Sequence, residues 1–288
     1  MSLSDFAYSV LLKPKPLRLA VNATLRSIVR PVVRRNGATI ALNPNDPVVS
    51  GALTLGVYEP LESQFFLSVC RPGMTFLDIG ANCGYYTAMF LSRAGSDARV
   101  VALEPDPQCF AYLHRTIEAN CATAVTCMAK AASDRAGIVS LYCNPDNRGD
   151  NRLYANSLGI LAHQVEAVTV DDAFLGLGLR SVDLIKMDVQ GYEAKVSRGM
   201  KRLIANSPEL ILLSEFWPWG LCQAGDSAQA LLEWLETAGL TVFHLESAGV
   251  LRPIGEFKSF SARYAGRQYT NIVAIKGSAS ERLVFHHA

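Results

Sequence analysis

Four acidic residues lie where short apolar runs end, and each could act on a bound ligand. They are Asp78, Glu104, Asp188 and Glu215. In an open parallel sheet, ligands bind beyond the carboxyl ends of the strands, so side chains that close different strands meet at one edge. Carboxylates at such an edge can hold a ribose or remove a proton from a hydroxyl group. The pattern predicts one polar site at one edge of a sheet.

A glycine turn follows the first of these acids. Residues 75–87 predict a buried strand, a tight turn bracketed by Gly80 and Gly84, and the first turn of a helix. Glycine allows a ligand to approach the main chain closely, and the helix directs free N–H groups toward that ligand. We therefore expect a cofactor at this turn. The alternative is an ordinary strand-to-helix turn, because isolated glycine motifs are weak signals.

The glycine spacing separates two classes of cofactor. A dinucleotide fingerprint that starts at Gly80 needs two further glycines where this chain has Asn82 and Tyr85. A bulky Tyr85 at the third glycine site would push the helix away from the sheet, and a cofactor without a pyrophosphate, such as S-adenosylmethionine, does not require that close approach. S-adenosylmethionine is favoured, with a nicotinamide-dependent oxidoreductase as the alternative. Glu104 follows the turn by about 20 residues, where an acid can accept hydrogen bonds from both ribose hydroxyls.

Strand and helix alternate through most of the chain. This alternation predicts an α/β fold with a mostly parallel sheet covered by helices on both faces. Residues 138–142 and 165–170 alternate like an antiparallel pair, and a polar insertion separates them. Ahead of the core, residues 38–42 predict a strand and 61–70 a helix. Further strands are expected at 99–103, 124–131, 182–189, 209–214, 241–245 and 271–275, and helices at 107–120, 190–204 and 227–238.

The composition limits the partners. The 288 residues include 27 Lys and Arg against 26 Asp and Glu, which argues against a nucleic-acid binder and favours a small or neutral partner. Seven cysteines without a C-x-x-C pair cannot form a complete set of internal disulfides, so we expect a reducing, cytoplasmic setting. No stretch approaches the roughly 20 apolar residues of a membrane span.

The N-terminal segment is basic and amphipathic. Residues 6–35 carry several lysines and arginines but no acid, and residues 17–30 predict a helix. We favour a surface helix packed on the domain, with peripheral contact to an anionic membrane as the alternative. The expected organisation is a basic segment at 1–36, a cap at 37–72, a core at 73–277 and a tail at 278–288.

Four motifs follow one another in the core. They are DIGANCGYYT at 78–87, EPD at 104–106, ASD at 132–134 and IKMDVQGYE at 185–193, with NP at 43–44 and GVYE at 56–59 ahead of them. Together they resemble the FkbM family of S-adenosylmethionine-dependent methyltransferases, from about residue 37 to residue 215. Family members often have Glu at the position of Gln190.

The resemblance implies a class I methyltransferase sheet of seven strands, in which the last strand is antiparallel and inserted between two others. It also implies transfer of methyl from S-adenosylmethionine to a hydroxyl of a carbohydrate or secondary metabolite. Glycine-turn residues would surround the methionine part of the cofactor, Glu104 would hold the ribose, and Ala132 and Ser133 would lie beside the adenine. The implied cofactor-binding residues are Glu59, Asp78, Gly80, Asn82, Gly84, Tyr85, Thr87, Glu104, Pro105, Asp106, Ala132, Ser133 and Asp188.

A sulfonium already activates its methyl group, so placement of the acceptor oxygen and removal of its proton are what the protein must add. Asp188 or Glu215 is the expected catalytic base, and His163 is a weaker candidate. Lys186 interrupts an apolar strand, and we expect it to be surface-pointing or ion-paired. No His, Cys and Asp cluster has metal-ligand spacing, so no metal is predicted.

The acceptor side has three candidate regions. They are Tyr58, the loop at 144–154 and the aromatic turn at 216–219, whose two tryptophans could instead form a packed corner. The expected acceptor is a small molecule or glycan. A catalytically silent module that keeps the cofactor pocket is the remaining alternative to an enzyme.

Overall fold

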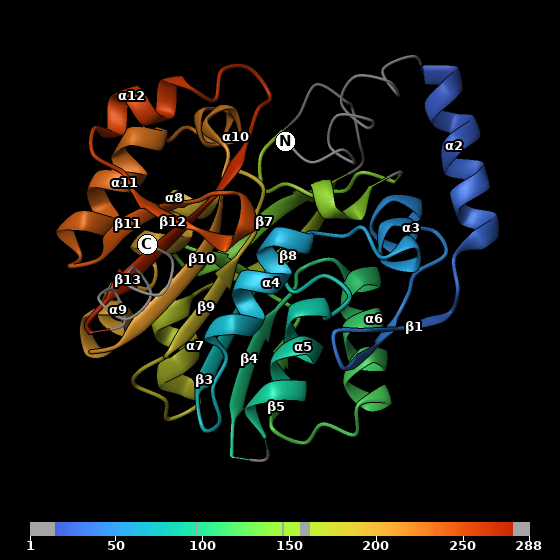
Figure 1. Cartoon of the computed structure of the whole chain (residues 1–288), viewed down its shortest axis with the longest axis horizontal. Helices are drawn as coiled ribbons and strands as arrows, with labels where there is room; N and C mark the ends of the chain where they lie inside the picture. Colours follow the sequence, from blue (N-terminus) through green and yellow to red (C-terminus); the bar gives the residue numbers. More distant parts are fainter. Residues whose placement is uncertain (1–14, 96, 146, 156–161, 279–288) are drawn as a thin grey trace.

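The computed structural model describes residues 15–95, 97–145, 147–155 and 162–278. Its centre is one eight-stranded sheet (Figure 1), in which β10, β9, β3, β4 and β5 run parallel and β13 is antiparallel to both β10 and β11. In order across the sheet, the strands are β12 (Leu251–Pro253), β11 (Thr241–Leu245), β13 (Thr270–Lys276), β10 (Leu210–Phe216), β9 (Leu184–Met187), β3 (Thr75–Ile79), β4 (Arg99–Leu103) and β5 (Val125–Met128).

The predicted α/β class is confirmed, including the antiparallel strand inserted between two others. The predicted count of seven strands is wrong by one, because the short β12 pairs with β11 and extends the sheet at its edge. Three residues at the edge of a sheet carry too weak a pattern to be read from the sequence.

Helices cover both faces of the sheet because successive strand residues point to opposite sides. Phe76 packs in one cluster with α4 (Pro60–Val69) and α5 (Tyr85–Ala94), and its neighbour Leu77 packs in the other with α9 (Lys201–Asn206) and α11 (Ala228–Thr237). The other α-helices that follow β3 in the described chain are α6 (Pro107–Ala119), α7 (Val170–Gly176), α8 (Glu193–Arg198), α10 (Pro218–Gln223) and α12 (Phe257–Ala262).

The cap contains more structure than the sequence predicted. The expected strand and helices appear as β2 (Ala38–Ala41), α4 and α2 (Lys15–Ile28), but β1 (Val32–Arg35) and α3 (Pro47–Leu55) were not predicted. β1 and β2 form a hairpin. α2 packs on α3, since a Cβ on Gly51 would lie 3.0 Å from the Leu25 side chain. Figure 1 shows α2 and α3 near α6, far from α11 and α12. Among the described residues, no helix is long and apolar enough to cross a membrane.

The antiparallel pair on either side of the polar insertion belongs to a second, three-stranded sheet. Its strands are β6 (Ala131–Ser133), β8 (Ala162–Thr169) and β7 (Gly137–Tyr142), and β7 pairs antiparallel with β8 as predicted. The single strand expected at 124–131 is wrong, because β5 belongs to the large sheet and β6 to this one.

One predicted helix is broken. Residues 190–204 form α8 and α9 with Gly199 between them. A Cβ at Gly199 would lie 2.0 Å from the carbonyl oxygen of Ser133, so the main chain must pass close to β6 at this point. The periodicity that predicted one helix contains no sign of that tertiary contact.

Candidate functional site

Asp78 ties the first strand of the core to the helix that follows it. Its Oδ2 accepts hydrogen bonds from the Thr87 amide at 3.1 Å and the Thr87 hydroxyl at 2.6 Å. Its side chain is buried, and this burial raises the pKa of Asp78 to about 6. Asp78 and Thr87 therefore fix the start of α5 relative to β3, which sets the shape of the glycine turn.

The glycine turn lies directly against the end of β9. Gly80 has φ +80°, and a Cβ built on it would lie 2.0 Å from the carbonyl oxygen of Asp188. Asn82 and Gly84 also have positive φ, at 50° and 81°. The turn and Asp188, which are far apart in sequence, are thus brought together as predicted.

Glu104 reaches the same turn from β4. Its two carboxylate oxygens accept hydrogen bonds from the amides of Asn82 and Asp106, each at 2.8 Å. Burial raises the pKa of Glu104 to about 8. Pro105 follows, and Asp106 caps α6 by accepting from Gln108 N at 2.7 Å. The other oxygen of Asp106 accepts from Asn151 at 2.7 Å and pairs with Arg148.

Asp188 and Glu215 are joined by one amide group. Gln190 Nε2 donates to Asp188 Oδ1 at 2.8 Å and to Glu215 Oε2 at 2.9 Å. Burial and the neighbouring Asp188 raise the pKa of Glu215 well above its usual range. The two candidate bases therefore share a site, and Gln190, to which the sequence assigned no role, fixes their relative position.

Lys186 is buried beside Asp188. It is 2% exposed, and its Nζ lies 3.5 Å from Asp188 Oδ2 and 5.0 Å from the centre of the Tyr86 ring. Burial opposes its charge, but Asp188 and Glu59 together hold the pKa of Lys186 above its ordinary value. The expectation of an ion-paired lysine is confirmed.

Glu59 joins the cap to the same cluster. It has φ +40° at the start of α4, and its carboxylate accepts a hydrogen bond from the Tyr86 hydroxyl. Burial raises the pKa of Glu59 to about 7, although Lys186 opposes the shift. Tyr86 was not among the predicted site residues, and its position beside Tyr85 in the turn motif was the available signal.

A narrow cleft of about 20 Å³ lies beside Lys186 and Asp188. The glycine turn forms one wall, Lys186 and Asp188 a second, and Val49 and Tyr58 of the cap the third. The space itself has room for about one water molecule. The glycine turn and the Asp188 carboxylate, which is 23% exposed, are the parts of its lining that would face a sulfonium cofactor.

Other predicted residues lie away from this cleft or have internal partners. Tyr85 lines the cleft, but its hydroxyl is hydrogen-bonded to Ser63 at 2.9 Å and Asn36 at 3.0 Å in the cap. Ala132 and Ser133 are buried in β6. His163 is exposed on β8, as expected for a surface histidine.

The aromatic turn after β10 packs against the Gln190 loop. A Cβ on Gly191 would lie 2.4 Å from the carbonyl carbon of Gly220, and Tyr154 donates to the Gln190 carbonyl at 2.8 Å. The Trp217 and Trp219 rings lie 5.1 Å apart. Cations lie over them, with the Arg152 guanidinium 4.8 Å from Trp217 and that of Arg267 5.2 Å from Trp219. These ring faces are occupied, which favours the packed corner.

Glu193 is a buried acid in this loop that retains a proton. Its Oε1 accepts from the amides of Val189 and Gly191 at 3.2 Å each, and Oε2 has no hydrogen-bond partner among the described residues. Burial raises the pKa of Glu193 to about 7.

This proton makes stability depend on pH. The unfolded chain releases it near the ordinary value of 4.5 and the native chain near 7, so the native state binds more protons between these values. The free energy of unfolding then falls as pH rises across that window, by about 1.4 kcal/mol per pH unit for one group. Glu193→Gln keeps the acceptor oxygen and is expected to flatten the slope by that amount. Urea unfolding at several pH values checks this, and equal slopes in both proteins would contradict it.

A family model and two known methyltransferases match this chain. The family model described as "Methyltransferase FkbM domain" matches residues 78–240, more than half of the chain. The chain is 27% identical over 154 residues to methyltransferase sdnD of Sordaria araneosa, covering 43% of this chain and 59% of that protein. It is 26% identical over 167 residues to methyltransferase 1 of Beauveria bassiana, covering 49% of this chain and 67% of that protein.

Two solved structures are also similar. The methyltransferase FkbM of Methylobacillus flagellatus is 14% identical, with a TM-score of 0.43, over 94% of this chain and 60% of that one. An S-adenosylmethionine-dependent O-methyltransferase of Thermotoga maritima is 14% identical, with a TM-score of 0.42, over 76% of this chain and 65% of that one. Because the family model matches more than half of the chain, the chain belongs to the FkbM methyltransferase domain family, whose cofactor is S-adenosylmethionine.

Proposed function

We propose that this protein transfers a methyl group from S-adenosylmethionine to a hydroxyl oxygen of a carbohydrate or secondary metabolite. The observation that supports this most is the convergence of the glycine turn, Glu104 and the Asp188 and Glu215 pair at one edge of the sheet. The family membership supplies the methyl transfer, and the acceptor class is the one that the resemblance of the sequence motifs implies.

In this proposal each group has a separate task. The turn at 80–84 and Asp78 hold the methionine part of the cofactor, Glu104 with Pro105 and Asp106 holds the ribose, and Ala132 and Ser133 lie toward the adenine. The donor supplies an activated methyl, so the new bond to oxygen forms as its carbon–sulfur bond breaks. The acceptor's proton passes to the protein.

Asp188 is the better candidate for the base. Burial and the neighbouring Asp188 raise the pKa of Glu215, which disfavours the charged form that a base needs. Asp188 is ion-paired with Lys186, and its side chain is 23% exposed, so an acceptor can reach it. Gln190 and Lys186 act as positioning residues because each contacts one oxygen of Asp188.

Calorimetry separates the proposed cofactor from its rival. S-adenosylhomocysteine is expected to bind and NAD is not, because Asn82 and Tyr85 replace glycines that a pyrophosphate site needs. Binding of NAD alone would favour an oxidoreductase. A panel of hydroxylated acceptors with labelled S-adenosylmethionine then tests transfer itself, and binding without any transfer would favour a silent module.

Glu104→Ala is expected to weaken S-adenosylhomocysteine binding. The variant loses hydrogen bonds to the ribose, each worth about 0.5–1.5 kcal/mol between neutral groups. It also frees the Asn82 amide, which lowers stability by about 1 kcal/mol or more. Calorimetric titration measures the first effect and urea unfolding the second. Unchanged affinity in a folded variant would remove Glu104 from the cofactor site.

A further inference from the structure

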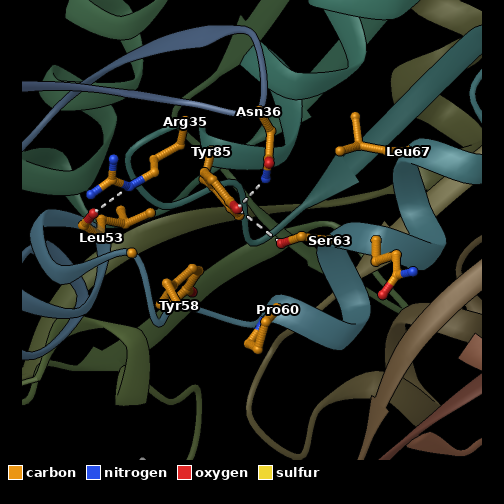
Figure 2. Close-up of a pocket in the computed structure, with 10 residues that line it drawn as sticks. Arg35, Asn36, Leu53, Tyr58, Pro60, Ser63, Leu67 and Tyr85 are labelled. Carbon is orange, nitrogen blue, oxygen red and sulfur yellow. Dashed lines mark hydrogen bonds between the residues drawn. The ribbon is translucent and has the colours of Figure 1, made fainter. Parts of the chain in front are cut away.

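A second cavity, of about 280 Å³, lies between the cap and α5 (Figure 2). Its volume is at the lower end of the range of small-molecule sites, about 300–1,000 Å³. The β1–β2 turn, the end of α3, the start of α4 and the first residue of α5 all contribute to it. The polar and aromatic residues that line it are Arg35, Asn36, Tyr58, Ser63, Gln64 and Tyr85.

This cavity shares a wall with the cleft that contains Asp188. Tyr58 and Tyr85 line both spaces, and their rings meet edge to face with centres 5.4 Å apart. The opposite side of the cleft is formed by Gly80, Lys186 and Asp188. The two tyrosines therefore separate the larger cavity from the proposed centre of methyl transfer.

The two tyrosines are held differently. The Tyr85 hydroxyl is fixed by Ser63 and Asn36, as the dashed lines in Figure 2 show. The Tyr58 hydroxyl has no hydrogen bond to any described residue. Tyr58 also lies between α3 and α4 rather than within a helix. Tyr85 is consequently a fixed wall, and Tyr58 is the side chain that can turn aside without breaking a hydrogen bond.

The lining indicates the chemistry of a ligand. Arg35 donates to the carbonyl oxygens of Leu53 at 3.1 Å, Arg34 at 3.1 Å and Thr54 at 2.7 Å, so three of its five N–H groups are engaged within the protein and two can bond hydroxyl oxygens of a ligand. The Gln64 amide, the side-chain amide oxygen of Asn36 and the Tyr58 hydroxyl remain to bond a ligand. Amide and hydroxyl groups beside aromatic rings suit a neutral molecule with several hydroxyls.

We propose that this cavity, the Tyr58 chamber, binds the methyl acceptor as a neutral unit about the size of one monosaccharide. Tyr58 is the partition that turns aside so that one hydroxyl of this unit reaches Asp188. The proposal rests on the methyl transfer proposed above. It places the acceptor in the cap, ahead of the family match at 78–240, rather than on the tryptophans, whose faces are already covered.

A filling variant tests the chamber. Leu67 lines the cavity, whereas Ser68 on the same helix is exposed and does not. Leu67→Trp adds bulk inside the chamber, and Ser68→Trp adds the same bulk outside as a matched control. A panel of methyl glycosides of common hexoses and deoxyhexoses is titrated, with S-adenosylhomocysteine present, by saturation-transfer NMR.

At least one glycoside is expected to bind the wild type and the control. Leu67→Trp is expected to weaken that binding at least about tenfold, which is about 1.4 kcal/mol, with unchanged affinity for S-adenosylhomocysteine. Gln64→Ala, which removes a polar group without adding bulk, is expected to weaken it severalfold and guards against misfolding of the tryptophan variant.

The outcomes separate the two proposals. If S-adenosylhomocysteine binds but no glycoside does, or if Leu67→Trp binds glycosides as the control does, the chamber proposal is overturned and the methyl-transfer proposal stands. If the wild type does not bind S-adenosylhomocysteine, the proposed function itself fails.

Discussion

Gly80→Ala is expected to destabilise the protein by about 3 kcal/mol or more and to abolish cofactor binding. An L-residue at positive φ costs roughly 1–2 kcal/mol, and the new Cβ would lie 2.0 Å from the Asp188 carbonyl oxygen. That atom belongs to the main chain at the end of β9 and cannot move aside alone, so the turn and the strand must separate. Urea unfolding measures the loss of stability, and calorimetry measures S-adenosylhomocysteine binding.

Gly225→Ala is a matched control for this substitution. Gly225 has φ +83°, but a Cβ there would have no atom within 4 Å. The control carries the backbone penalty without the clash, so we expect a loss of about 1–2 kcal/mol and normal cofactor binding. Equal losses in the two variants would show that the close approach of the turn to β9 contributes nothing.

Asp188→Asn is expected to leave a folded protein that binds the cofactor but transfers methyl roughly 10²- to 10⁴-fold more slowly, the usual contribution of a positioned base. The amide retains an oxygen for the Gln190 contact but cannot take the acceptor's proton. Single-turnover rates with labelled cofactor and one active acceptor measure the effect.

Glu215→Gln is the comparison for Asp188→Asn. Because burial raises the pKa of Glu215 and so favours its neutral form, the amide is a close mimic, and we expect a rate within several-fold of the wild type. A slow Glu215→Gln with a fast Asp188→Asn would exchange the roles of the two acids.

The parts of the fold that depend on local pattern could be predicted. The apolar run before Gly80 and the glycines on either side of the turn are enough to define β3 and α5. The helix α3 was not predicted, although Asp46 caps it, Pro47 begins it and Gly56 ends it. The break at Gly199 depends on a contact with β6 and could not be predicted from periodicity.

The candidate site also has features that the sequence predicts and features that depend on tertiary packing. The convergence of Asp78, Glu104 and Asp188 could be predicted because strand ends share an edge. The bridging role of Gln190 could not, since it requires β9 and β10 to be neighbours and the residue to adopt φ +52°. The cavity at Tyr58 also depends on how α3, α4 and the β1–β2 turn pack together, which composition does not determine.

The central position of β13 has a consequence for synthesis of the protein on the ribosome. β13 follows every other strand of the large sheet in sequence, yet it pairs with β10 on one side and β11 on the other. Until residues 270–276 have been made, no strand joins β11 and β12 to the rest of the sheet. The unpaired edge of β10 is then available for pairing with other chains. The outer edge of β10, the strand that carries Glu215, therefore stays unpaired until β13 has been made.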